Sequence, residues 1–404
     1  MTFKHRIIIL GGGAAGFFAA IHNKEAFPDS DVIIIEQHSK VLSKVKISGG
    51  GRCNVTHACF DIKELVSYYP RGGKALYGLF SRFQPEDTMR WFDLRGVKLK
   101  IEQDNRVFPI SDSSQTIIDC LTDTAYKLGI KVWTECRVNT VKKADDMFFL
   151  NLADGQIIES NKLILASGSS RLGYDIARSF GHHIINPLPS LFTFKLNDKE
   201  FTSLSGISVP HVSVCILNIN KSQQFGPLLI THQGLSGPAV IKLSAWEAIY
   251  LANLNYNFKI RVNWLPTLTK LEIYDELDQI CQNYQQKQLV SISPFPELPL
   301  RLWQYFILKN NHLKSLRWNH LTQKNKEYLY DILTNTHLNI VGKSPFKEEF
   351  VTCGGVDLDE VDFKTMESKL CNGLHFVGEI LNIDGVTGGF NFQNAWSTGV
   401  VSSY

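Results

Sequence analysis

The sequence predicts an α/β fold with a parallel sheet that begins at the N-terminus, a separate β unit from about residue 187, and a C-terminal stretch of glycine-rich loops around a buried strand. Three observations support this prediction. A buried strand, residues 6–10, leads directly into a glycine run, a helical period follows over residues 14–21, and a second apolar strand covers residues 32–35. A strand, a helix and a strand in this order form the unit from which parallel sheets grow. Near the C-terminus a further apolar strand, residues 374–377, lies among glycine-rich loops.

The glycine run has the spacing of a dinucleotide-binding turn. Gly11 permits the tight turn, Gly13 lets the backbone approach a pyrophosphate, and Gly16 lets the helix pack closely on the strand. Glu36 follows the second strand, 20 residues after Gly16, where a carboxylate can bind a ribose hydroxyl. The sequence therefore predicts a dinucleotide at a helix N-terminus, with an ordinary glycine-rich turn as the alternative.

Length and composition are those of a globular protein of two or three domains, with 404 residues, of which 44% are hydrophobic and 20% charged. The formal net charge of +3 gives no overall field for a nucleic acid or an anionic membrane. Charge is uneven, however, because residues 40–106 contain thirteen Lys or Arg against seven Asp or Glu. This segment is predicted to be electropositive.

Cysteine usage and hydropathy favour a cytoplasmic protein. The eight cysteines include no C-x-x-C pair, so neither a zinc site nor a disulfide framework is expected, and we predict reduced thiols and no metal. The N-terminal apolar run is too short for a signal peptide, and no run of about twenty apolar residues predicts a membrane span.

Periodicity and turn residues place the remaining elements. In the first half we expect, in order, helices at residues 85–96 and 113–128 and strands at residues 131–138, 148–152, 156–159 and 162–166. From about residue 187 the character changes to β, with strands at residues 209–217 and 256–264 and then helical periods at residues 268–286, 299–310 and 325–333. The chain ends in a helix from about Asn391. A helical piece therefore interrupts a β piece.

Further glycine clusters lie far apart in the sequence, at residues 46–54, 167–168 and 385–393. Glycines let backbone N–H groups approach a phosphate or a ring edge, and Arg52 could place a positive charge against a pyrophosphate. Each cluster alone could be an ordinary turn. Together with the N-terminal glycine run, they favour one large cofactor.

Several of these strings resemble one known family. They are KISGGGRCNVT at residues 46–56, THQGLSGP at residues 231–238, TMESK at residues 365–369, Gly378-Glu379, and GFNFQ after Gly388 with Ala395-Trp396 beyond it. In this order, between residue 5 and about residue 400, they resemble the BaiN/RdsA-like family of NAD(P)/FAD-dependent oxidoreductases. The resemblance implies a Rossmann-like FAD domain of the glutathione-reductase type with an inserted β-barrel domain that carries a helical bundle. The implied boundaries are 1–188 and 348–404 for the FAD domain, 189–266 and 334–347 for the barrel, and 267–333 for the helical insert.

The resemblance also implies the residues that bind FAD. The pyrophosphate would lie at Gly11, Gly13, Ala14, Ala15 and Gly16, the adenosine ribose at Glu36 and Gln37, and the adenine near Val138. The flavin side would be lined by Gly50, Gly51, Arg52, Cys53 and Asn54. The ribityl chain would lie near Gly378 and Glu379. The isoalloxazine would contact Gly389, Phe390, Asn391 and Phe392. A helix that begins near Asn391 would aim its positive end at the flavin.

Three places depart from the family pattern. Ala166, Ser167, Gly168 and Ser169 stand where the family has Ala-Thr-Gly-Gly, and Ser167 keeps a hydroxyl that can bind FAD. Residues 172–175 are Leu-Gly-Tyr-Asp where the family has Gly-Asp-Gly-Tyr. Asn382 stands where an aspartate is usual, and Asp384 is the nearest residue that could replace its charge.

The chain shows no second glycine fingerprint, so a nicotinamide donor, NAD(P)H, is expected to dock transiently. Cys53 is a candidate flavin-adjacent thiol, with a buried inert cysteine as the alternative. His232 is a candidate proton donor, with a structural histidine as the alternative.

Three functions are compatible with these features. The resemblance favours hydride transfer from FAD to a carbon–carbon double bond of a small molecule. The alternative is reduction of a uridine of ribosomal RNA to dihydrouridine, which the basic segment 40–106 and a second patch would support. From charge alone, solvated helix faces and structural tryptophans are the favoured explanation of such patches. The second patch comprises Lys309, Lys314, Arg317, Trp318, Lys324 and Lys326. A flavin-binding protein without turnover is the third, and no feature favours it.

Overall fold

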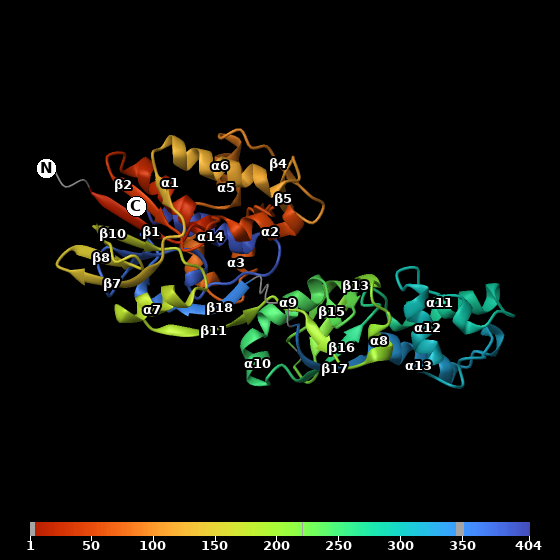
Figure 1. Ribbon diagram of the computed structural model, residues 1–404. Coiled ribbons are helices and arrows are strands. Elements are labelled where there is room, and N and C mark those ends of the chain that lie inside the picture. Colours follow the sequence, from red (N-terminus) through yellow and green to blue (C-terminus); the bar gives the residue numbers. More distant parts are fainter. Residues whose placement is uncertain (1–4, 220, 345–350) are drawn as a thin grey trace. The chain divides into compact units, whose positions relative to one another are not determined.

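The computed structural model describes residues 5–219, 221–344 and 351–404. The chain divides into two compact units, which are shown together in Figure 1 and are described separately below. The first unit comprises Met1–Leu188 and Val351–Tyr404, and the second comprises Pro189–Phe350. Both ends of the chain therefore contribute to the first unit.

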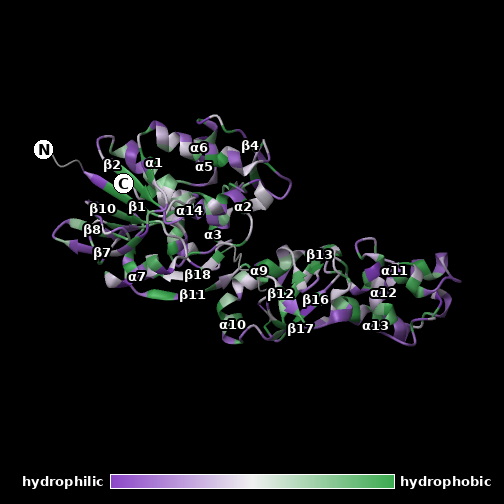
Figure 2. Ribbon diagram, in the orientation of Figure 1, coloured by the Kyte–Doolittle hydropathy of each residue, from purple (hydrophilic) through white to green (hydrophobic). Residues whose placement is uncertain are grey.

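A seven-stranded sheet forms the centre of the first unit in the described residues, in the order β19-β20-β21-β10-β1-β2-β6. The strands are β1 (Arg6–Leu10), β2 (Asp31–Ile35), β6 (Lys131–Trp133), β10 (Lys162–Leu165), β19 (Val361–Asp362), β20 (Glu367–Ser368) and β21 (Leu374–Phe376). The five strands from β21 to β6 run parallel, with Ile8 opposite Ile33 and Leu163. Both faces of a parallel sheet are covered, which explains why β1 and β2 are almost continuously apolar and buried. Figure 2 shows these central strands as predominantly hydrophobic. The predicted α/β fold class is confirmed.

Helices and small sheets surround this centre. The helices are α1 (Ala14–Ala26), α2 (Ser43–Gly51), α3 (Ile62–Val66), α4 (Gly73–Phe80), α5 (Pro85–Asp93), α6 (Ser114–Lys127), α7 (Arg171–Ser179) and α14 (Phe390–Val401). The small sheets are β3-β5-β4, built from Thr56–His57, Arg106–Pro109 and Leu99–Ile101; β7-β8-β9, built from Val138–Ala144, Met147–Leu152 and Ile157–Ser160; and β11-β18, built from Ile184–Ser190 and Val351–Val356.

One predicted strand, residues 131–138, is wrong in its extent. The chain leaves the central sheet after Trp133, and Glu135 has a positive φ of 54° that breaks the extended backbone. Val138 then begins β7, which belongs to a different sheet. In β7 only the side chains of Val138 and Val141 are buried, so the strand has no alternating apolar pattern. For this reason the sequence did not predict β7.

The second unit contains a closed barrel in the strand order β12-β15-β14-β13-β16-β17. Its strands are β12 (Phe194–Leu196), β13 (Ser208–Ile216), β14 (Gln224–Thr231), β15 (Gly234–Ser236), β16 (Phe258–Asn263) and β17 (Thr336–Lys343). Three helices accompany it, namely α8 (Lys199–Thr202), α9 (Pro238–Trp246) and α10 (Ala248–Asn253). The predicted barrel is therefore present.

A helical insert lies between β16 and β17 in the sequence. It consists of α11 (Lys270–Asn283), α12 (Leu300–Leu308) and α13 (Gln323–Thr334), with 3₁₀ turns at Leu289–Ser291 and Trp318–His320. Thr269 begins α11 with a capping box, in which its hydroxyl accepts from the Glu272 N–H and the Glu272 carboxylate accepts from the Thr269 N–H. The insert and the barrel share one apolar core.

Candidate functional site

The turn between β1 and α1 forms an open seat for an anion. Gly11 has a φ of +120°, and a Cβ atom there would lie 2.4 Å from the Ala166 carbonyl oxygen. At Gly16 a Cβ atom would lie 2.0 Å from the Gly11 carbonyl oxygen, so neither position tolerates a side chain. A Cβ atom at Gly13 would meet nothing within 4 Å, because the space before the helix is open. The positive end of α1 therefore faces a space that a pyrophosphate can fill.

Glu36 lies beside this seat in a fixed orientation. One carboxylate oxygen accepts a hydrogen bond of 2.9 Å from the Gly12 N–H, and the other accepts one of 2.9 Å from the His38 N–H. A hollow beside Glu36 brings together Gln37, Val138 and Ser167, which the sequence analysis placed at the ribose, the adenine and the 166–168 loop. Its complete lining is Leu10, Gly11, Ile35, Glu36, Gln37, Cys136, Val138, Ser167, Ser170 and Leu172.

Two buried oxygen atoms at the predicted site have no hydrogen-bond partner among the residues that the structure describes. They are the Ser167 hydroxyl oxygen and the Asn54 side-chain oxygen. Buried polar atoms are normally paired, because an unpaired one costs roughly 1–3 kcal/mol. The open glycine seat and these two oxygens fit a large polar ligand such as FAD.

The N-terminal turn of α1 and the C-terminal segment meet at Gly378. This residue has a φ of +73°, and a Cβ atom there would lie 2.7 Å from the Ala15 Cβ and 3.9 Å from the Ala395 Cβ. Its N–H donates a hydrogen bond of 2.9 Å to the Thr398 hydroxyl. Gly378, from the C-terminal part of the chain, therefore packs against the first turn of α1 and the middle of α14.

The loop before α14 is held by side-chain and backbone contacts. The Asn391 amide donates to the Gly385 carbonyl and accepts from the Gly385 N–H, both at 2.8 Å. Gly389 has a φ of +96°, and a Cβ atom there would lie 2.6 Å from the Thr56 carbonyl oxygen. The loop thus lies directly on β3.

The ring of Phe390, a residue predicted to meet the isoalloxazine, packs among protein side chains. The ring is 1% exposed and stacks on His57 and Tyr68, with centroid separations of 4.6 and 4.5 Å. Only the backbone of Phe390 remains as a possible flavin contact. Phe392 is half-buried and stacks on Trp396 at 5.6 Å.

His57 and Tyr68 are site residues that the sequence analysis missed. The His57 Nδ1 lies 3.1 Å from the Gly388 carbonyl oxygen, which fixes the proton on that nitrogen because a carbonyl only accepts. Tyr68 donates a hydrogen bond of 3.2 Å to Glu64. The available signal was that His57 directly follows the KISGGGRCNVT string.

The loop at residues 49–54 leaves two of its glycines accessible but pairs its arginine with a protein carboxylate. At Gly50 and Gly51 a Cβ atom would meet nothing within 4 Å, so the backbone there is accessible to a ligand. Arg52, however, pairs with Glu102 at 2.6 Å and lies 3.9 Å above the Phe108 ring. Its charge is therefore directed at a protein carboxylate, and the hydrogen bond to Glu102 raises the pKa of the guanidinium.

Glu379 also has protein partners. One carboxylate oxygen accepts a hydrogen bond of 3.0 Å from the Thr352 N–H, and the other pairs with the Lys44 ammonium. The sequence analysis did not identify Lys44, because the two partners are 335 positions apart.

The charge of Asp384 does not replace the aspartate that Asn382 lacks. Asp384 is fully buried and forms a two-bond ion pair with Arg71, so the charge is neutralised locally. Asn382 accepts a hydrogen bond of 3.2 Å from the Gly354 N–H.

The two candidate catalytic residues differ in position. Cys53 is fully buried with a φ of 62°, and burial raises the pKa of its thiol to about 12, which is the character of an inert cysteine. His232 is exposed and lies in the second unit, in the turn from β14 to β15, whereas the predicted FAD residues all belong to the first unit.

The predicted electropositive segment is largely neutralised. Of its thirteen cations, eight lie within 4.0 Å of a carboxylate: Lys44, Arg52, Arg71, Arg90, Arg95, Lys98, Lys100 and Arg106. In the second patch, Lys309 pairs with Asp198 and Lys326 with Asp278. Trp318 is fully buried against Trp303 and so is not available to stack on a base, which corrects its assignment to that patch.

Three further properties of the described residues concern membrane spanning, metal binding and disulfide formation. Among the described helices, none has the length and apolar character needed to cross a membrane. The same residues contain no group of three or more His, Cys, Asp or Glu side chains arranged to hold a metal ion. All eight cysteines are free.

The fold and this site define the class of protein as a dinucleotide-binding flavoprotein oxidoreductase. Residues 5–404 match the family model described as HI0933-like protein Rossmann domain, and the chain belongs to that family of FAD-dependent oxidoreductases. The BaiN/RdsA-like resemblance is thereby confirmed.

Relatives with assigned activities cover nearly the whole chain. A 3-dehydro-bile acid delta(4,6)-reductase of Clostridium scindens is 29% identical and matches 98% of each chain. A ribosomal RNA dihydrouridine synthase of Escherichia coli is 30% identical and matches 97% of this chain and 95% of its own.

Solved structures with low identity share the fold. A 3-ketosteroid delta1-dehydrogenase from Sterolibacterium denitrificans has a TM-score of 0.51 at 10% identity and matches 100% of this chain and 99% of its own. A flavocytochrome c3 fumarate reductase has a TM-score of 0.50 at 16% identity, matching 100% of this chain and 78% of its own. These likenesses agree with the Rossmann-type FAD-binding fold.

Proposed function

We propose that this protein reduces a carbon–carbon double bond of a small molecule, using FAD bound across the two chain ends. The observation that carries this proposal is the packing of Gly378, from the C-terminal segment, against Ala15 in the first turn of α1, beside the open glycine seat. When bound there, FAD supplies a hydride for the double bond. The protein's own residues bind and orient the cofactor.

Each part of the site has a separate role in this proposal. The α1 N-terminus at Gly13 binds the pyrophosphate, and Glu36 orients the ribose. Ser167 and Asn54 complete their hydrogen bonds on the ligand. Asn391 fixes the loop that brings the positive end of α14 toward the flavin.

The named activities of the two relatives support this reaction type. A delta(4,6)-reductase removes double bonds, and a dihydrouridine synthase saturates the double bond of uridine. Both reactions add a hydride and a proton across two carbons. We infer the same chemistry here, with NAD(P)H as a transiently docked electron donor.

Reduction of a ribosomal RNA uridine is the second candidate. The observation that favours it is the 30% identical Escherichia coli relative, together with the exposed cations Lys314, Arg317 and Lys324 on the helical insert. The stretch from residue 309 to residue 326 contains no Asp or Glu. Positive loops of this kind suit phosphate contacts.

Two assays test the proposal. Purified protein should be yellow, with the flavin absorption bands, and should consume NAD(P)H when a 3-oxo-4,6-diene bile acid is added. In parallel, ribosomal RNA from a strain that lacks the gene is analysed for dihydrouridine by mass spectrometry. Loss of one dihydrouridine from that RNA would identify ribosomal RNA, and not a small molecule, as the substrate. A colourless protein that does not bind added FAD contradicts both candidates.

A further inference from the structure

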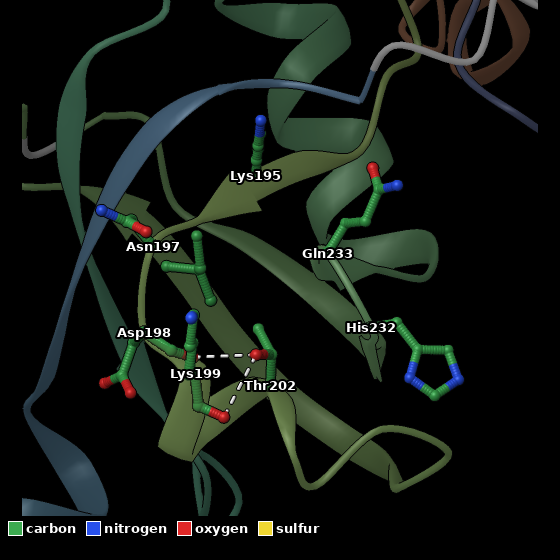
Figure 3. Close-up of a pocket in the computed structure, with 8 residues that line it drawn as sticks. Lys195, Asn197, Asp198, Lys199, Thr202, His232 and Gln233 are labelled. Atoms are coloured by element: carbon green, nitrogen blue, oxygen red, sulfur yellow. Dashed lines mark hydrogen bonds between the residues drawn. The ribbon is translucent and has the colours of Figure 1, made fainter.

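The second unit contains a hollow that the FAD site does not explain. It is lined by Lys195, Leu196, Asn197, Asp198, Lys199, Thr202, His232 and Gln233, and Figure 3 shows these side chains. His232 and Gln233 lie on one side, in the turn from β14 to β15, and residues 197–199 lie on the other. All of these residues belong to one compact unit.

A glycine brings the two sides together. Gly234 has a φ of +153°, and a Cβ atom there would lie 2.1 Å from the Phe194 carbonyl oxygen. The Leu196 N–H donates a hydrogen bond of 2.9 Å to the Gln233 carbonyl. The turn that carries His232 is therefore fixed directly against β12, and the hollow is a built feature of the barrel.

The charge of the hollow favours an anion. No ion pair within the described residues involves Lys195, Lys199 or His232. The single carboxylate of the lining, Asp198, is already occupied, since one oxygen accepts from the Phe201 N–H at 2.9 Å and the other lies 3.7 Å from the Lys309 ammonium. The side-chain amides of Asn197 and Gln233 add hydrogen-bond donors.

We propose that this hollow binds an oxyanion, a carboxylate or a phosphate of the kind that the proposed substrates carry. This inference rests on the proposed function for the identity of the ligand, but its geometry does not involve the FAD site. Two lysines, a histidine and two amides match the charge and hydrogen-bond acceptors of a carboxylate or a phosphate. The carboxylate would come from a bile-acid-like small molecule, and the phosphate from an RNA strand.

The experiment titrates the FAD-containing full-length protein by calorimetry with cholate, with a short oligouridylate and with inorganic phosphate. The test variant is Lys195→Ala/Lys199→Ala. The matched control is Lys259→Ala/Arg261→Ala, which removes the same two charges from exposed positions on β16 of the same unit. A third variant, His232→Gln, keeps a neutral polar side chain at the turn.

We expect the test variant to bind the probe that the parent prefers at least about tenfold more weakly, because it loses charge-assisted hydrogen bonds. The control variant should bind that probe with the affinity of the parent. His232→Gln should give a smaller loss. Tighter binding of cholate identifies a small carboxylate as the source of the anion, and tighter binding of oligouridylate identifies RNA phosphate.

Equal affinity in the test and control variants, or no binding of any probe to the parent, overturns the proposal. Flavin absorbance is measured on every sample and should be unchanged by these substitutions. Protein that does not bind added FAD but still binds an anion through Lys195 and Lys199 would refute the proposed function and leave the anion site standing.

Discussion

At the scale of single residues, Gly13 provides the sharpest test of the cofactor site. A Cβ atom there meets no protein atom within 4 Å, so Gly13→Glu should leave the fold intact. The new carboxylate would repel the diphosphate, and we expect FAD to bind roughly a hundredfold more weakly, equivalent to about 3 kcal/mol. Flavin absorbance after gel filtration measures this loss.

The control is Gly78→Glu, which introduces the same side chain at an equally open position on α4. This variant should retain FAD in full. Stoichiometric FAD in Gly13→Glu would contradict the assigned pyrophosphate seat.

Ser167 should affect stability and binding in opposite directions. Its buried hydroxyl has no hydrogen-bond partner in the described part of the chain, so Ser167→Ala should stabilise the FAD-free protein by about 1 kcal/mol. The same change removes a donor to FAD and should weaken binding about fivefold. Thermal unfolding of the FAD-free protein and a flavin fluorescence titration measure the two effects.

Ser160→Ala is the matched control, because the buried Ser160 hydroxyl already donates a hydrogen bond of 2.6 Å to the Lys162 carbonyl. This variant should lower stability and leave FAD affinity unchanged. If both serine variants lose stability alike, Ser167 has no ligand-binding role.

The residue scale also shows how far the sequence could predict the site. Gly11, Gly13 and Glu36 were recognisable because their functions depend on spacing within one strand-helix-strand unit. Lys44 was not recognisable, because its partner Glu379 lies 335 positions away. The contact of His57 with Gly388 spans 331 positions, so only its place after the KISGGGRCNVT string could have marked it. The sequence predicted a pyrophosphate as the partner of Arg52, whereas the structure pairs it with Glu102, because an ion pair between loops leaves no periodic pattern.

At the scale of elements, the crossing of α1 and α14 determines the position of the site. A Cβ atom at Gly399 would lie 2.9 Å from the Phe18 Cβ and 3.0 Å from the Ala19 backbone nitrogen. Gly399→Ala should therefore separate the helices and lower the free energy of unfolding by about 1–3 kcal/mol. Denaturant titration measures this change.

Gly78→Ala should act in the opposite sense, because the position lies in a helix and has open space around it. Replacing a helical glycine by alanine typically adds about 0.5–1 kcal/mol of stability. A stable Gly399→Ala variant with normal FAD content would show that the close helix contact is not required.

The buried histidines of the first unit predict a loss of stability in acid. Burial, followed by the nearby Lys162, lowers the pKa of His375 in β21 to about 3, and burial with Arg95 lowers that of His22 in α1 to about 4. The unfolded chain takes up protons near pH 6.5, whereas the folded protein does not. Stability is therefore complete above pH 6.5 and falls as the pH decreases toward 4 and 3.

Each histidine should contribute about 2 kcal/mol to the difference in unfolding free energy between pH 7 and pH 5. Denaturant titrations of the parent and of His375→Gln at both pH values measure this contribution, and the variant should show the smaller decrease. The control His312→Gln alters an exposed histidine and should follow the parent. Equal decreases in all three proteins would show that His375 is protonated in the folded state.

Element prediction succeeded where apolar patterns were strong and failed where they were weak. The strands β1, β2 and β10 were located to within a residue because nearly every side chain in them is buried. The strand β7 exposes most of its side chains and was missed. Trp318 was assigned to a surface patch because its neighbours Arg317 and Asn319 are polar, whereas a 3₁₀ turn buries its ring against Trp303.

At the scale of the whole molecule, the two units predict separable functions. The chain leaves the first unit after Leu188, on β11, and re-enters it at Val351, on β18, and these two strands form one small sheet. We therefore expect that residues 189–350 can be replaced by a flexible linker of about six Gly and Ser residues. The first unit should then fold and retain FAD.

The excised protein should be yellow and should lose the anion binding that depends on Lys195 and Lys199. Flavin absorbance, circular dichroism and the calorimetric titration measure these outcomes, with Gly13→Glu in the same shortened chain as the control that folds without FAD. The prediction follows from the absence of any predicted FAD residue between positions 189 and 350. A folded but colourless first unit would mean that the second unit supplies part of the cofactor site. The assignment of FAD binding to the first unit alone would then be wrong.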